Sequence, residues 1–142
     1  MLFDQTLMLA DKQAVTADAA GADAAGNALV ITPKGDDYST MWVAILVDTA
    51  FTTSGSPSAA TIEAKLQTTA ASDSDFSTPT VLASRTINIA SANKGDVIAF
   101  RLPIGMKDKV RLYFDVTLTG GTTPAITAGK LTAGLTDGIF TR

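Results

Sequence analysis

The acidic residues closest to a recognisable chemical pattern are Asp73 and Asp75, which stand two apart in "SDSDFSTP" at residues 72–79. The first ligands of a calcium-binding loop have this spacing, but a loop of the EF-hand kind also needs a central glycine and a closing glutamate. The stretch has neither, and its flanking pattern is strand rather than helix. We therefore expect no metal ion here. Instead, we expect Asp73 and Ser74 to make turn hydrogen bonds to backbone amides, with Phe76 tucked under the loop as its anchor.

The other acidic candidates are weaker. Asp36 and Asp37 could form a second cation site or an acidic pair for catalysis, but no partner carboxylate can be inferred, so a solvated turn is the better interpretation. Asp115 lies on the polar side of an alternating segment, near Arg111 and Tyr113. We expect it to form a cross-strand charge pair or an interface contact.

Two short segments could contact a ligand or a partner. A sugar could stack on Trp42 and Tyr38, but one Trp and two Tyr in the whole chain offer little aromatic surface. A core Trp at the start of a buried strand is the better interpretation. The segment "MKDK", with Lys107 and Lys109, is the one local cluster of positive charge. It is either a solvated hairpin end or a contact with an acidic partner surface.

The composition excludes several classes of function. The chain has no cysteine and no histidine, which removes disulfides, thiolate and histidine metal sites, and the usual catalytic triads. Its net charge is −3 and it has no basic stripe, so we expect no binding to nucleic acid. The longest apolar run, Met41–Val47, is far short of a membrane helix, and the N-terminus makes a poor signal peptide. We expect the protein to work where it is made or in something assembled there.

Hydrophobic alternation with a period of two predicts an all-β antiparallel sandwich or jelly roll. Segment 41–49 is apolar on both faces, as in a central strand. Glycines 129 and 134 suggest a bulge or a close backbone approach, and the Ala-rich segment 17–28 is interpreted as a loop, with at most one helical turn. The expected strands lie at residues 41–49, 61–68, 81–90, 96–103, 110–119 and 126–136.

The chain divides into an N-terminal arm, roughly residues 1–15, and a single β domain, residues 16–142. The arm is too apolar to be a free tail, so it must pack on its own domain or on a neighbour. Its apolar residues include Leu2, Phe3, Leu7 and Leu9.

The order of these segments resembles the jelly-roll capsid cement proteins, also called decoration or stabilisation proteins, of tailed bacteriophages. The resemblance covers nearly the whole chain and depends most on "SDSDFSTP", "RLPIG…VRLYFDV" and "TAGKLTAGL". The chain departs from the family's pattern in the Ala-rich "ADAAGADAAG" and in "MKDKV".

The resemblance implies a structural virion protein with no enzymatic activity and no cofactor. Such a protein is made in the host cytoplasm, sits on the capsid exterior, bridges copies of the major capsid protein and self-associates as a dimer or trimer. Leu2, Phe3, Leu7, Leu9, Lys107 and Lys109 are the expected partner contacts. The main alternative is a carbohydrate- or receptor-binding β-sandwich of a tail fibre or adhesin. An enzyme with a glycosidase-like carboxylate pair is a third hypothesis.

Overall fold

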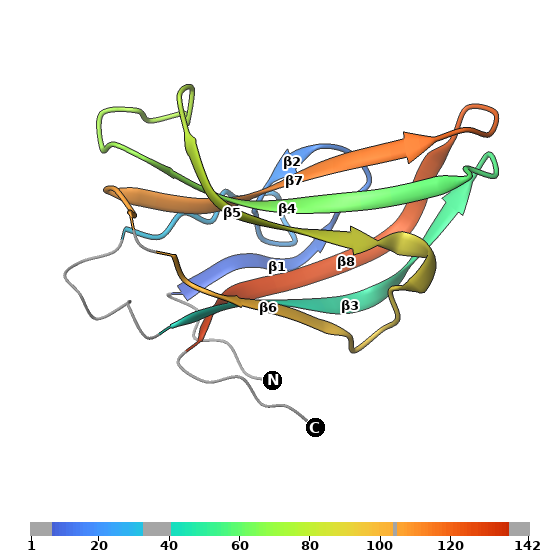
Figure 1. Ribbon diagram of the computed structural model, residues 1–142, viewed down its shortest axis with the longest axis horizontal. Coiled ribbons are helices and arrows are strands. Elements are labelled where there is room, and N and C mark those ends of the chain that lie inside the picture. Colours follow the sequence, from blue (N-terminus) through green and yellow to red (C-terminus); the bar gives the residue numbers. More distant parts are fainter. Residues whose placement is uncertain (1–6, 33–40, 104, 137–142) are drawn as a thin grey trace.

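The protein is a sandwich of two four-stranded antiparallel β-sheets, seen in a computed structural model that describes residues 7–32, 41–103 and 105–136 (Figure 1). The strand orders are β1-β8-β3-β6 and β2-β7-β4-β5, here called sheet A and sheet B. The 3-10 turn η2 (Ile89–Ser91) lies between β5 and β6. The strands are β1 (Met8–Ala14), β2 (Ala19–Ala20), β3 (Trp42–Ser54), β4 (Ala59–Thr69), β5 (Thr80–Asn88), β6 (Val97–Arg101), β7 (Lys109–Thr119) and β8 (Ala125–Thr136).

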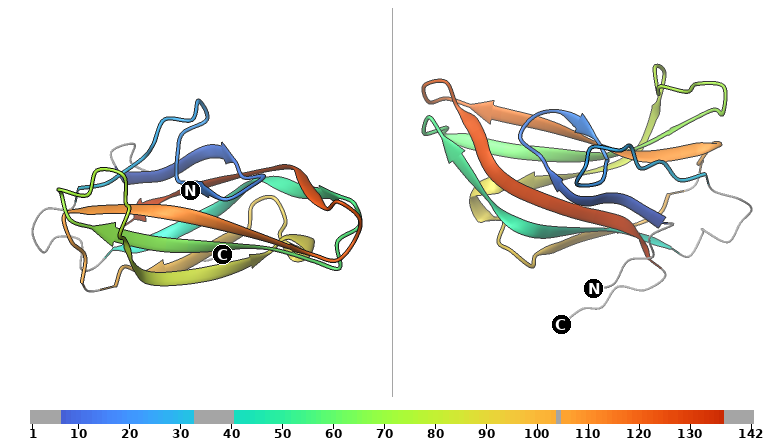
Figure 2. Two further views of the ribbon diagram at one scale, coloured as in Figure 1. Left: turned by 90° about the horizontal axis from the view of Figure 1, so that it is seen from above. Right: turned by 180° about the vertical axis from the view of Figure 1, so that it is seen from behind.

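The strand order is that of a jelly roll. Consecutive strands pair off so that one lies in sheet A and the other in sheet B: β1–β2, β3–β4, β5–β6 and β7–β8. Two Greek keys that wind into a double sheet have this arrangement. Seen from above and from behind, the two sheets lie face to face, and β1 and β2 lie along the same side (Figure 2). The predicted all-β antiparallel sandwich is confirmed, and no described segment is a helix that could cross a membrane.

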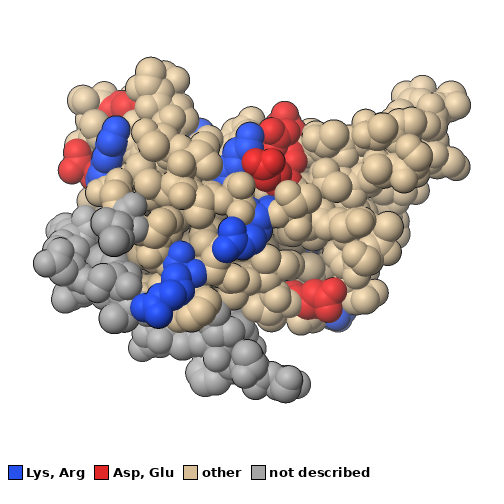
Figure 3. Space-filling model, in the orientation of Figure 1, with Lys and Arg blue, Asp and Glu red and all other residues tan. Residues whose placement is uncertain are grey.

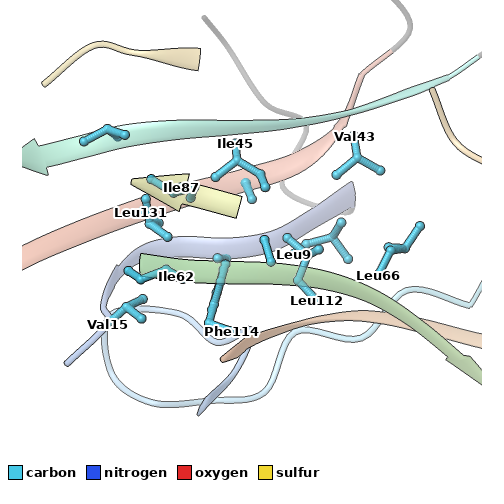
Figure 4. Close-up of a cluster of buried hydrophobic side chains, with 14 of the residues drawn as sticks. Leu9, Val15, Val43, Ile45, Ile62, Leu66, Ile87, Leu112, Phe114 and Leu131 are labelled. Carbon is cyan, nitrogen blue, oxygen red and sulfur yellow. The ribbon is translucent and has the colours of Figure 1, made fainter. Parts of the chain in front are cut away.

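The core fills the space between the sheets with side chains from the alternating strands. Ile62 and Leu66 of β4 and Leu112 and Phe114 of β7 are fully buried there, and the close-up shows them opposite residues of sheet A, such as Ile45 (Figure 4). Burying each such side chain contributes about 1.5–3 kcal/mol. The period-two pattern therefore predicted these core residues correctly.

The described part of the expected N-terminal arm packs on its own domain, which is one of the two alternatives expected from the sequence. Residues 8–14 form β1, an edge strand that pairs antiparallel with β8, from Met8 opposite Gly134 to Ala14 opposite Lys130. Leu9 is 0% exposed inside the core, and Leu7 packs partly against it. The expected partner contact at Leu9 is therefore wrong, because this side chain is used by its own domain.

The alanine-rich segment contains a strand where we expected a loop. β2 pairs with Tyr113 and Phe114 of β7, and its two residues are too few to show alternation. The following Gly21 passes so close to β1 that a Cβ on it would lie 2.0 Å from the Leu9 carbonyl oxygen. This segment thus covers the edge of sheet B beside β1.

Trp42 begins β3 as expected, but it is not a core residue. It is half-buried, and the guanidinium of Arg101 lies 5.6 Å from the centre of its ring. The two residues are direct partners in the β3–β6 register and so share one face of sheet A. The indole is thus covered by an arginine and does not pack between the sheets.

Candidate contact surfaces

The loop of residues 70–79, between β4 and β5, is closed around the carboxylate of Asp73. One carboxylate oxygen accepts hydrogen bonds from the Ser77 amide and hydroxyl, both at 2.9 Å. The other accepts from the Thr69 hydroxyl at 2.6 Å and the Thr78 amide at 3.1 Å. The Thr69 hydrogen bond, followed by those of the Thr78 and Ser77 amides, lowers the pKa of Asp73. The predicted turn bonding of Asp73 is confirmed.

Phe76 anchors this loop as predicted. The ring is 6% exposed, and the guanidinium of Arg111, from β7, lies 4.1 Å from its centre. Arg111 also donates from Nε to the Gln67 side-chain oxygen at 2.9 Å, and it lies 5.6 Å from the Tyr113 ring. A cation held over an aromatic face is attracted to it, so this stack fixes the loop on the outer face of sheet B.

Residues 105–109, before and at the start of β7, pack against the same loop. The buried Thr68 hydroxyl accepts from the Lys107 amide at 2.7 Å and donates to the Lys109 carbonyl at 2.9 Å. Asp108 accepts from the Ala71 amide at 2.9 Å. The Lys109 ammonium donates to the Asp73 carbonyl at 2.6 Å. Lys109 therefore stabilises its own loop, and the partner contacts expected at Lys109 and at the exposed Lys107 stay predictions.

The acid on the outer face of β7 forms the expected cross-strand charge pair. Asp115 accepts a hydrogen bond from the Lys65 ammonium of β4 at 3.0 Å, and Glu63 lies 3.9 Å from the same ammonium. The hydrogen bond to Asp115 raises the pKa of Lys65, and the negative charges of Asp115 and Glu63 add to this. These charges on sheet B are therefore satisfied within the protein.

Other residues singled out from the sequence are not brought together. Leu2, Phe3, Asp36, Asp37 and Tyr38 lie outside the described residues. Among the residues that are described, no three Asp or Glu side chains are grouped so that they could hold a metal ion.

Two neighbouring corners at the end of the sandwich opposite these loops carry no charge. Residues 49–62 and 116–129 contain no Lys, Arg, Asp or Glu, and they form the β3–β4 and β7–β8 corners. We call these two ranges the uncharged tip. Of the described strands of sheet A, only β3 and β8 continue into it, because β6 pairs with residues 42–46 and β1 with residues 130–134. Figure 3 shows the uncharged tip at the upper right, without blue or red atoms.

The two corners of the uncharged tip are locked together. The Thr122 amide donates to the Gly55 carbonyl at 2.9 Å, and the Ser58 amide donates to the Thr119 carbonyl at 2.8 Å. A Cβ on Gly121 would lie 2.2 Å from the Gly55 carbonyl oxygen, so glycine is needed for this approach. The tip is thus a rigid surface of small and hydroxyl-bearing side chains.

A family model named Bbp16 matches residues 9–135, from the buried Leu9 of β1 to the buried Leu135 of β8. The chain belongs to the Bbp16 family. No curated protein sequence matches it. The family match includes β1, which agrees with the placement of this strand inside the sandwich of the Bbp16-family chain.

A shallow pocket of about 430 Å³ lies at the base of the uncharged tip in this Bbp16-family fold. The Asp18 carboxylate accepts a hydrogen bond from the Val116 amide at 2.7 Å. This contact lies next to the two residues of β2 that pair with β7. The pocket is lined by Thr16, Ala17, Asp18, Val116 and Leu118.

Reasoning from the sequence missed the uncharged tip as a surface. The signal was present, since each charge-free stretch is visible in the sequence of this Bbp16-family chain. The two stretches are more than 50 residues apart, and the pairing of β3 with β8 and of β4 with β7 joins them.

Proposed function

We propose that the protein is a capsid cement protein of a tailed bacteriophage. It binds the exterior of the head shell and bridges neighbouring copies of the major capsid protein, without a cofactor and without catalysing a reaction. We also expect it to self-associate on the shell as a dimer or trimer.

The uncharged tip is the observation that carries this proposal. The central part of a protein interface is depleted of charged residues relative to the rest of the surface, and 18% of this chain is charged while the tip has no charge. The tip is also rigid, because its two corners share hydrogen bonds and close glycine contacts. A preorganised surface loses little conformational entropy on binding.

The opposite end of the sandwich supports a mechanical role. The loops around Asp73 and Thr68 are held by side-chain hydrogen bonds and by the Phe76–Arg111 stack. A stiff body with contact surfaces at separate places can join two subunits of a lattice. Each contact can be weak, because a copy that is already bound by one surface makes its second contact at a high effective concentration.

The resemblance seen in the sequence is consistent with this function. Its three most telling segments form the β4–β5 loop, the passage from β6 into β7, and β8. These are structural parts of both sheets, so the resemblance extends over the same sandwich that the family match covers.

Sedimentation with empty phage shells tests the proposal. We expect the protein to pellet with the shells in a saturable way. Ala125→Glu adds a charge to the exposed start of β8 in the uncharged tip and should weaken binding about tenfold or more, since burying an unpaired charge is costly. Ala24→Glu adds the same charge at an exposed site outside the tip and is the matched control. Failure of the unaltered protein to bind shells would refute the function.

The carbohydrate-binding alternative makes a different prediction. It requires exposed aromatic rings on which sugars can stack, whereas Arg101 covers Trp42 and Arg111 covers Phe76. A glycan array separates the two functions: a specific glycan signal that is lost in Trp42→Ala would favour the alternative.

A further inference from the structure

Among the strands that the structure describes, β5 and β6 are edge strands on the same side of the sandwich. β5 is the last strand of sheet B and β6 the last strand of sheet A, and both lie toward the viewer in Figure 1, away from β1 and β2. Free edges leave backbone N–H and C=O groups available to an added chain segment.

Arg85 lies on the β5 edge and is exposed. Its direct partner on β4, Ala64, is buried, so the arginine starts from the inner face of sheet B and reaches the open seam. Its guanidinium lies 5.0 Å from the centre of the Phe100 ring of β6 and donates to the Ser84 carbonyl at 2.8 Å. The aromatic ring therefore holds the cation at the seam between the sheets.

Arg101 gives the β6 edge a second cation of the same kind. It is exposed, and its guanidinium lies 5.6 Å from the centre of the Trp42 ring. Phe100 and Arg101 are neighbours in β6, so their side chains point to opposite faces of sheet A. Arg85, which contacts Phe100, and Arg101 therefore lie on the two sides of the β6 edge. We call Arg85, Phe100, Arg101 and Trp42 the arginine edge.

No described carboxylate neutralises the arginine edge. Both ion pairs found among the described residues involve Lys65, on the outer face of sheet B. The chain as a whole has more acids than bases, with a net charge of −3. Figure 3 nevertheless shows blue groups over β5 and β6 with no red atoms between them.

We propose that the arginine edge binds an acidic, extended segment of a partner protein. A guanidinium group has its N–H donors in a planar fork that matches a carboxylate, and here the nearby aromatic ring of each arginine helps to position it. Arginines are also frequent anchors of interfaces. A second copy is a poor occupant, because edge-to-edge contact would bring four guanidinium groups together. On the proposed function, on which this step rests, the acidic segment belongs to the major capsid protein.

The test compares three variants for binding to shells over a range of salt concentrations. Arg85→Gln with Arg101→Gln should weaken binding about tenfold or more and make it less dependent on salt. The same pair changed to Lys keeps the charge but loses the fork, and should retain part of the affinity. Lys130→Gln removes one exposed charge on β8, away from this edge, and should bind like the unaltered protein. If the double Gln variant binds as tightly as Lys130→Gln, the inference is wrong.

Binding to poly-L-glutamate is a second test, and it does not depend on the shell. The unaltered protein should bind it more tightly than the double Gln variant, while Lys130→Gln behaves like the unaltered protein. If shells fail to bind but this difference is seen, the proposed function fails and the acidic-segment site stands. Equal binding of poly-L-glutamate by all variants, or a preference for single-stranded DNA over poly-L-glutamate at the same salt, would overturn it.

Discussion

The ring of Phe51 lies against the backbone of Gly129 so closely that no side chain fits there. A Cβ on residue 129 would lie 2.1 Å from a carbon of the ring. The glycine also has φ of +136°, a conformation that side chains disfavour. The β3–β8 register shifts at this place, between Thr49 and Thr52. The close approach thus seats Phe51 at the base of the uncharged tip.

Gly129→Ala should lower the free energy of unfolding by about 2–4 kcal/mol, since strain and overpacking add. Chemical denaturation measures this. Gly26→Ala is the control, because Gly26 also has positive φ, +91°, but has nothing within 4 Å of an added Cβ. It should cost about 1–2 kcal/mol, the strain of an L-residue in this left-handed conformation. Equal losses in the two variants would show that the Phe51 contact contributes nothing.

Most strands could be predicted from the sequence because their side chains alternate between core and solvent. β4 and β7 are such strands, and Gly129 was predicted to mark a bulge or close approach, which it does. β1 was not recognised, because its register shifts between Met8 and Ala10 and again between Ala10 and Gln13. Two irregularities in seven residues erase the period of two, so the segment looked like an apolar arm.

Leu9→Ala tests the corrected role of β1. Removing a fully buried leucine should lower the free energy of unfolding by about 2–5 kcal/mol. Met8→Ala, at the half-buried neighbouring position, should cost much less. Urea denaturation of both variants gives the comparison. A Leu9→Ala protein as stable as the unaltered one would restore the arm interpretation.

The candidate surfaces were predictable only where they are local in sequence. The Asp73 turn is local, since its partners lie within five residues, and it was predicted. The Phe76–Arg111 stack joins a loop to a distant strand. The pairing of Arg85 with Phe100 joins strands of different sheets. Contacts of this kind depend on the tertiary fold, which residue spacing does not specify.

Asp73→Asn should destabilise the protein near neutral pH and have less effect in acid. The hydrogen bonds lower the pKa of Asp73 below its unfolded value of about 4. The stabilisation is therefore present above about pH 4 and is lost as the pH falls through the folded pKa. Thermal melts of Asp73→Asn and of the unaltered protein, measured from neutral pH into acid, should show that the difference between their Tm values becomes smaller as the pH falls. The exposed Asp75→Asn is the control and should melt like the unaltered protein.

Calcium should leave the Tm unchanged. Both carboxylate oxygens of Asp73 already accept hydrogen bonds from Thr69, Ser77 and Thr78, and a calcium ion needs six to eight oxygen ligands. Melting curves with calcium and with a chelator test this directly. A calcium-dependent rise in Tm that Asp73→Asn removes would establish a metal site in this loop.

Thr68→Val should destabilise the protein more than Thr68→Ser, although valine keeps the apolar bulk. The Thr68 hydroxyl accepts a hydrogen bond from the Lys107 amide and donates one to the Lys109 carbonyl, and the residue is 0% exposed. Valine leaves both backbone groups without this partner, which should lower the free energy of unfolding by about 2–4 kcal/mol. Serine keeps the hydroxyl and loses one buried methyl group, which should lower the free energy of unfolding by about 1 kcal/mol. Urea denaturation ranks the two variants. The reverse order would mean that methyl packing, and not the hydroxyl bridge, holds the β6–β7 connection against β4.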